Sequence, residues 1–230
     1  MDRVAAPVTV QEVRAAAELA VRTSYGRLVA QLAARTGDLA LAEDVLADAL
    51  ERALRTWPRT GVPDNPEGWL VTMARNRLVD VLRSAAHRTF APLDAAVDRL
   101  AADPLAVDPD ALPDRRLELM LVCAHPEVEA HVRTPLMLQV VLGLDARTIA
   151  AAFALPPATL AQRLVRAKRR IAAARVPFEV PDRRELASRL PSVLEAVYAA
   201  HATAPLGGKP LNEEARYLAL VLATLLPDEP

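Results

Sequence analysis

An apolar stripe with the period of an α-helix runs through residues 39–57. Asp38 directly precedes the stripe, and a carboxylate at that position can accept hydrogen bonds from the first free N–H groups of a helix. We therefore predict a helix that begins after Asp38 and buries one face. The stripe recurs at steps of three and four residues and consists of Leu39, Ala42, Leu46, Ala49, Ala53 and Trp57.

The core of this chain has to be built from small and aliphatic side chains. Hydrophobic residues make up 52% of the sequence but aromatic residues only 3%, and Ala and Leu favour closely packed helices over sheets. The sequence therefore predicts an all-α fold. A helical period returns after the proline-rich loop 58–66, in Trp69, Leu70, Met73, Ala74, Leu78, Val81 and Leu82.

The predicted helices fall into two small domains and a C-terminal extension. Residues 10–88 form the first domain, with three helices. Residues 89–112 form an extended acidic linker, because prolines interrupt the helical period and residues 91–129 contain nine acidic and three basic residues. Residues 113–176 form the second domain, and residues 182–230 a short helical extension.

Particular residues place the boundaries of the later helices. Pro113 suits the first turn of a helix that reaches Cys123, and Pro126 separates it from a second helix that ends near residue 142, with Gly143 just past its end. A short helix is expected after Asp145. Two amphipathic helices, 186–200 and 212–226, follow on either side of a Pro/Gly-rich turn.

Composition excludes several classes of protein. The single cysteine, Cys123, excludes an internal disulfide, and Cys and His positions show no zinc-ligand spacing, so we expect no metal and no cofactor. No apolar run approaches the roughly 20 residues that span a bilayer, and the N-terminus lacks the pattern of a secretory signal. We expect a cytoplasmic protein with no membrane partner. No catalytic triad, phosphate loop or carboxylate pair indicates an enzyme.

The strongest motif lies between Arg147 and Arg170. Residues 148–153 predict a short helix, 154–156 a tight turn, and Pro157 the start of a longer helix, which is the pattern of a helix-turn-helix. The small side chain of Ala150 allows the two helices to approach each other. The apolar side chains expected between them are Ile149, Phe153, Leu155, Leu160 and Leu164.

The outward face of that longer helix suits DNA. Residues 157–176 carry six basic residues and no acidic one, which favours DNA binding over an αα-hairpin with a solvated basic face. Short or polar side chains near the helix N-terminus can reach base edges, and Gln and Arg donate to purines. The predicted base-reading residues are Ala158, Thr159, Gln162, Arg163 and Arg166, with Arg169 and Arg170 over phosphates.

Two further polar surfaces could bind a partner, and the alternative for each is that it is an ordinary solvated helix face. Opposite the apolar stripe of 39–57 lie acidic residues suited to a basic protein surface: Glu43, Asp44, Asp48 and Glu51. The helix after Pro66 and the loop before it carry amide and guanidinium groups suited to holding an unstacked base. These polar residues are Arg59, Asp64, Asn65, Thr72, Arg75, Asn76, Arg77, Asp80, Arg83 and Arg88.

Taken in this order, the segments resemble an extracytoplasmic-function sigma factor, of the group with a helical C-terminal extension. Residues 38–49 are similar to the core-binding helix of sigma region two, and residues 66–80 to the helix that melts promoters and reads the −10 element. Residues 161–171 are similar to the −35 recognition helix of region four.

The resemblance implies partners and site residues. It implies a factor for transcription initiation that binds core RNA polymerase, with its acidic residues Glu43, Asp44, Asp48 and Glu51 on the β′ clamp and a further contact to the β flap. It implies promoter DNA, with a flipped −10 base in the loop that follows Arg59, and an anti-sigma factor or other regulator. The −10 set is Arg59, Asp64, Asn65, Trp69, Arg75, Asn76, Asp80 and Arg83.

The sequence departs from this family at two places. The family segment similar to 121–126 has two adjacent cysteines, whereas Ala124 stands here in place of the second, so we expect Cys123 to be a buried thiol without a redox role. The residues after Pro181 provide only part of the family's C-terminal extension. The alternative function is a stand-alone helix-turn-helix regulator, and a third hypothesis is a helical adaptor that has lost DNA binding.

Overall fold

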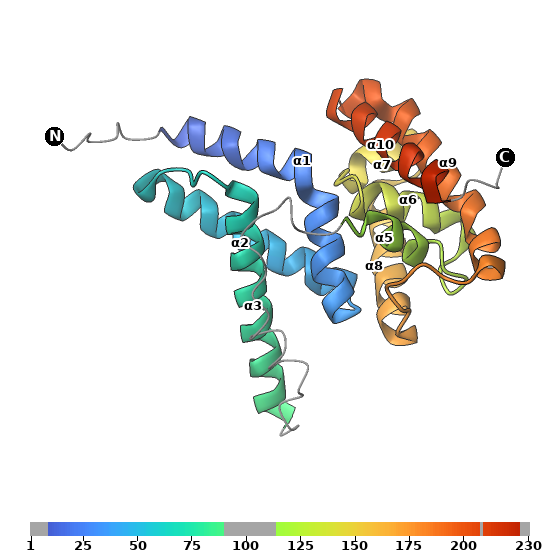
Figure 1. The fold of residues 1–230 in the computed structure, drawn as a ribbon, viewed down its shortest axis with the longest axis horizontal. Helices are drawn as coiled ribbons and strands as arrows, with labels where there is room; N and C mark the ends of the chain where they lie inside the picture. Colours follow the sequence, from blue (N-terminus) through green and yellow to red (C-terminus); the bar gives the residue numbers. More distant parts are fainter. Residues whose placement is uncertain (1–8, 90–113, 208, 226–230) are drawn as a thin grey trace. The chain divides into compact units, whose positions relative to one another are not determined.

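The computed structural model describes residues 9–89, 114–207 and 209–225, and all regular structure in these ranges is helical (Figure 1). The chain divides into two compact units. The first contains the residues up to Ser24 and those from Leu41 to the end of the third helix. The second contains Tyr25–Ala40 and the residues from Asp114 onward. The all-α prediction is confirmed.

The first three helices are α1 (Val10–Thr36), α2 (Leu39–Thr60) and α3 (Pro66–Thr89). Asp38 begins α2 as predicted, since its Oδ1 accepts a hydrogen bond of 2.9 Å from the Ala40 N–H. The predicted apolar stripe of α2 is buried along its whole length, from Leu39 to Trp57. On α3 the buried side chains include Leu70, Ala74 and Leu78, as the helical period requires.

The prediction of a loop from Pro58 was wrong. α2 continues through Pro58 to Thr60 and ends where Gly61, at φ +86°, donates its N–H to the carbonyl of Trp57. The reason is tertiary: the Trp57 ring is fully buried, with its centroid 5.4 Å from that of Trp69 in an edge-to-face contact. This contact anchors the last turn of α2, where a proline removes only one backbone donor.

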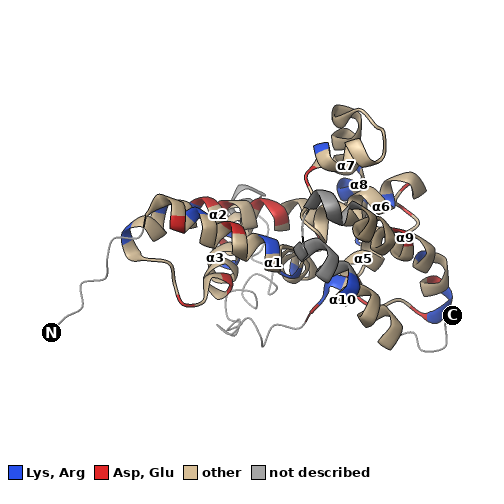
Figure 2. Ribbon diagram, turned by 90° about the horizontal axis from the view of Figure 1, so that it is seen from above, with Lys and Arg blue, Asp and Glu red and all other residues tan. Residues whose placement is uncertain are grey.

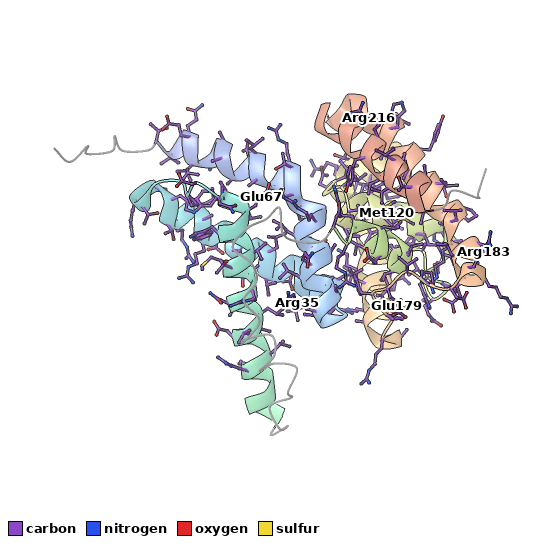
Figure 3. All side chains as sticks on the ribbon, viewed as in Figure 1. Arg35, Glu67, Met120, Glu179, Arg183 and Arg216 are labelled. Carbon is purple, nitrogen blue, oxygen red and sulfur yellow. The ribbon has the colours of Figure 1, made fainter. Side chains whose placement is uncertain are left out.

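The second unit continues with α5 (Arg116–Cys123), α6 (Ala130–Val140), α7 (Ala146–Ala152) and α8 (Pro157–Ala174). Its core includes Leu119, Leu121, Leu136, Leu138 and Met120, which is labelled in Figure 3. Cys123 is buried as predicted. α5 begins at Arg116 instead of at Pro113: Arg115 before it is not helical, and the Asp114 carboxylate accepts a hydrogen bond from the Arg116 N–H.

Two long helices, α9 (Arg183–Gly207) and α10 (Lys209–Leu225), complete the unit and lie side by side (Figure 1). Both begin earlier than predicted, and the expected Pro/Gly-rich turn is helical except at residue 208, outside the described part. α9 packs against α5 and α6. The buried Arg189 secures this contact, because it donates to the carbonyl oxygen of Leu121 and forms an ion pair of 2.6 Å with Glu185.

α10 is tied to the first residues of α5. The guanidinium of Arg116 lies 4.6 Å from the ring centroid of Tyr217 in a cation–π contact. Burial and a hydrogen bond to Asp114 raise the pKa of Tyr217. α9 and α10 therefore belong to one body with α5 and α6. The predicted acidic linker lies at 90–113, outside the described residues.

Candidate nucleic-acid interface

Acidic residues, red on the ribbon of α2 in Figure 2, lie on the part of the helix opposite its buried stripe. Asp44, Asp48 and Glu51 are exposed, whereas Glu43 is half-buried. Glu51 pairs with Arg55 at 3.5 Å, and Asp48 with Arg77 of α3 at 2.6 Å. Arginines of the same unit therefore neutralise part of the negative charge of this acidic stripe.

The predicted polymerase-binding residues did not include Arg77 of α3, which contacts the acidic face of α2 through Asp48. Its Nε donates to Oδ2 of Asp48, and this hydrogen bond raises the pKa of Arg77 above its ordinary value. Asp80, one turn further along α3, acts in the same direction. Nothing in the local sequence signals the pair, because Asp48 and Arg77 are 29 residues apart.

The loop before α3 is shorter than predicted. Arg59 belongs to the last turn of α2, and residues 61–65 connect the two helices. Asn65 begins α3, because its Oδ1 accepts a hydrogen bond of 2.9 Å from the Gly68 N–H. The side-chain oxygen that was expected to hold a base thus also has a structural role. Asp64 is exposed beside it.

One face of α3 carries the exposed polar residues Asn76, Asp80 and Arg83. Their spacing of four and three residues places them in a row along the helix. Trp69 and Arg75 are half-buried, and the ring of Trp69 rests against that of Trp57. The predicted −10 residues therefore divide into an exposed row on α3, the exposed pair Arg59 and Asp64, and three residues held by contacts within the fold.

The predicted helix-turn-helix is present as α7, a turn and α8. Asp145 caps α7, because its Oδ1 accepts hydrogen bonds from the N–H groups of Arg147 (2.9 Å) and Thr148 (3.0 Å). The hydrogen bond from the Thr148 hydroxyl is the largest cause that lowers the pKa of Asp145. Ala154 makes the turn at φ +51°. α8 then begins at Pro157, in the position that suits proline.

The predicted DNA-reading side chains of α8 are not equally accessible. Ala158, Gln162 and Arg166 are exposed, and Thr159 and Arg163 are half-buried. Of the two expected phosphate contacts, Arg169 is exposed and Arg170 forms an ion pair with Glu129 at 2.9 Å. Leu160 and Leu164 face the core as predicted, together with Ile149 and Ala150 of α7. The exposed members of this set, among them Gln162, Arg166 and Arg169, are therefore mostly polar and basic.

Comparison with known proteins bears on these surfaces. The family model of sigma-70 region 2 matches residues 21–88, which include α2 and α3. The probable extracytoplasmic-function RNA polymerase sigma factor SigI of Mycobacterium tuberculosis (strain H37Rv) is 30% identical over 147 residues, 63% of this chain and 50% of that protein. The match to sigma-70 region 2 and the similarity to SigI support an extracytoplasmic-function sigma factor.

A second relative matches more of this chain. Uncharacterized protein R00370 of Rhizobium meliloti (strain 1021) is 36% identical over 204 residues, 84% of this chain and 48% of that protein. The chain spans about half the length of the curated relatives that it matches. No solved structure matches it.

The remaining site predictions concern metals and membranes. Among the residues that the structure describes, no group of three or more His, Cys, Asp and Glu side chains is placed to hold a metal ion. No helix in the same ranges is both long enough and apolar enough to cross a membrane.

Proposed function

We propose that this sigma factor binds core RNA polymerase and directs it to promoters whose −10 and −35 elements it reads with separate helices. The observation that carries the proposal is the combination of two modules in one chain. Residues 21–88 match sigma-70 region 2, and α7 and α8 form a helix-turn-helix with a basic outer helix. A stand-alone regulator requires only the second of these modules, and neither module is that of an enzyme.

The acidic face of α2 is the proposed polymerase surface. Asp44, Asp48 and Glu51 are exposed on it, and carboxylates so placed complement a basic surface such as the one we expect on the β′ clamp. Glu43 is half-buried and therefore supplies less of the contact. A β-flap contact by the second unit is part of the same proposal.

The −10 element is assigned to α3 and the loop before it. Asn76, Asp80 and Arg83 form an exposed row that can follow one strand of melted DNA. Asp64 is exposed just before α3 and Arg59 in the last turn of α2, on either side of the loop where a flipped base would be held by its edge. Trp69, Asn65 and Arg75 support this surface from within the fold.

The −35 element is assigned to α8. Gln162 and Arg166 are exposed on its outer face and suit base edges, and Arg169 suits a phosphate. α9 and α10 belong to the same body through Arg189 and Tyr217. We expect them to act as the helical extension that an anti-sigma factor or other regulator would engage.

Run-off transcription tests the proposal directly. Purified core polymerase is supplied with genomic fragments, with the chain, without it, and with the Asp44→Lys/Asp48→Lys variant. We expect discrete transcripts only with the parent chain. Absence of transcripts, together with failure of the chain to co-purify with core polymerase, would refute the proposed function.

A further inference from the structure

A small hollow in the second unit lies between α8 and the start of α6. Its volume is about 10 Å³, close to the smallest that holds one water molecule. The apolar part of its wall comes from Val132 and Ala167, which are buried. The hollow is lined by Glu129, Val132, Arg163, Arg166, Ala167 and Arg170.

Three arginines thus line the same hollow as one carboxylate. Arg163, Arg166 and Arg170 are three and four residues apart, so they share the side of α8 that faces Glu129. Nη1 of Arg170 donates to Oε1 of Glu129 at 2.9 Å, and Nε2 of His131 lies 3.6 Å from Oε2. The side chains of Arg170 and Glu129 are about half exposed, at 49% and 48%.

A carboxylate among guanidinium groups has the chemistry of a bound phosphate. Both anions accept charge-assisted hydrogen bonds from Arg, and Arg170 is among the residues predicted to lie over DNA phosphates. Nη1 of Arg170 already donates to the Glu129 carboxylate, so a phosphate that takes this donor displaces the carboxylate from it.

We propose that Glu129 is an internal competitor of DNA: it occupies the place of a backbone phosphate on α8, and duplex binding displaces it. The inference rests on the proposed function of α8. It adds a positioning residue outside the helix-turn-helix that sets how strongly the free chain holds DNA. An ion pair as exposed as this one is weak, so displacement is easy and the effect on affinity is graded.

Binding of a random-sequence DNA duplex to the full chain tests the inference, because phosphate contacts do not depend on base sequence. Fluorescence anisotropy is recorded over a series of low salt concentrations. We expect Glu129→Gln to bind about two- to fivefold more tightly than the parent. The slope of log affinity against log salt should steepen by about 0.9, the value for one added phosphate contact.

Three further variants separate this contact from a general effect of charge. Glu127→Gln removes the same charge two residues away, from an exposed side chain that does not line the hollow, and should change affinity much less. Arg170→Ala should abolish the gain, so that the double variant Glu129→Gln/Arg170→Ala binds like Arg170→Ala. Equal gains from Glu127→Gln and Glu129→Gln, or a gain that persists without Arg170, would overturn the inference.

The test also distinguishes this inference from the proposed function. Arg169→Ala changes an exposed residue of α8 that does not line the hollow, and it should weaken duplex binding. If Arg169→Ala weakens binding and Glu129→Gln has no specific effect, α8 binds DNA and the competitor inference alone fails. If Arg169→Ala has no effect, the proposed role of α8 fails as well.

Discussion

Asp48 of α2 and Arg77 of α3 form an ion pair in which Arg77 Nε lies 2.6 Å from Asp48 Oδ2. The pair joins the helix proposed to bind polymerase to the helix proposed to read the −10 element. Both side chains are about half exposed, at 47% and 51%, so the pair contributes little to stability. The pair matters for binding, because it engages the Asp48 carboxylate that is proposed to contact polymerase.

The first prediction uses this pair to test polymerase binding. Reversing Asp44 and Asp48 to Lys should abolish co-purification with core polymerase, because the new charges repel a basic clamp surface. The fold should persist, since both residues are exposed, although Asp48→Lys also places two cations side by side. Thermal unfolding measured by circular dichroism provides the check on folding.

A charge swap supplies the matched control. Asp48→Arg combined with Arg77→Asp keeps an ion pair between the same two positions but exchanges its polarity. We expect this variant to unfold like the parent and still to lose polymerase binding. Retained binding would mean that the polymerase does not recognise the carboxylate of Asp48.

The second prediction concerns the −35 element. Arg163→Ala and Gln162→Ala should each weaken binding to it by about 1 to 3 kcal/mol, the discrimination that a good base-edge contact provides. Gln162 is exposed, whereas Arg163 is half-buried beside Glu129, so we expect the clearer loss of specificity from Gln162. Competition between cognate and scrambled duplexes measures it. Identical behaviour of both variants and the parent would remove α8 from base recognition.

The third prediction is a pH dependence in the helix-turn-helix. Asp145→Ala should destabilise the second unit by about 1 kcal/mol at neutral pH, because it removes the N-cap of α7. Hydrogen bonds from Thr148 and Arg147 lower the pKa of Asp145. A lowered pKa in the folded state stabilises above the ordinary pKa of about 3.9, and this stabilisation is lost as the pH falls through the lowered value.

Melting temperatures of the parent and Asp145→Ala should therefore converge as the pH falls from neutral through the lowered pKa of Asp145. Asp44→Ala, which removes an exposed carboxylate from the middle of α2, should show no comparable difference at any pH. A gap between parent and Asp145→Ala that stays constant down to acid pH would show that the carboxylate does not act through its charge.

The fourth prediction is that the free chain binds duplex promoter DNA poorly and binds it strongly with polymerase. The net charge is only −1, and residues 91–129 carry nine acidic and three basic residues, which compete with phosphates for the arginines of α8. Glu129, the last residue of that stretch, already does so through Arg170. Anisotropy with a labelled promoter, with and without core polymerase, measures the difference; tight specific binding by the chain alone would contradict it.

Local rules in the sequence were sufficient for most of the helical framework. The caps at Asp38 and Asp145 and the buried stripe from Leu39 to Trp57 depend on hydrogen bonds and spacings within a few residues. Such short-range features follow from helix geometry alone. The helix-turn-helix was predictable for the same reason.

The tertiary structure decided where α2 ends and which charges are paired. The Trp57–Trp69 contact carries the helix through Pro58 against local preference. The pairs Asp48–Arg77 and Glu129–Arg170 join residues 29 and 41 positions apart. The helical period of a sequence shows which residues share a face of a helix, but not which neighbouring helix that face contacts. The sequence alone therefore determined the basic and acidic faces, and only packing of the helices determined which of their charges the protein neutralises itself.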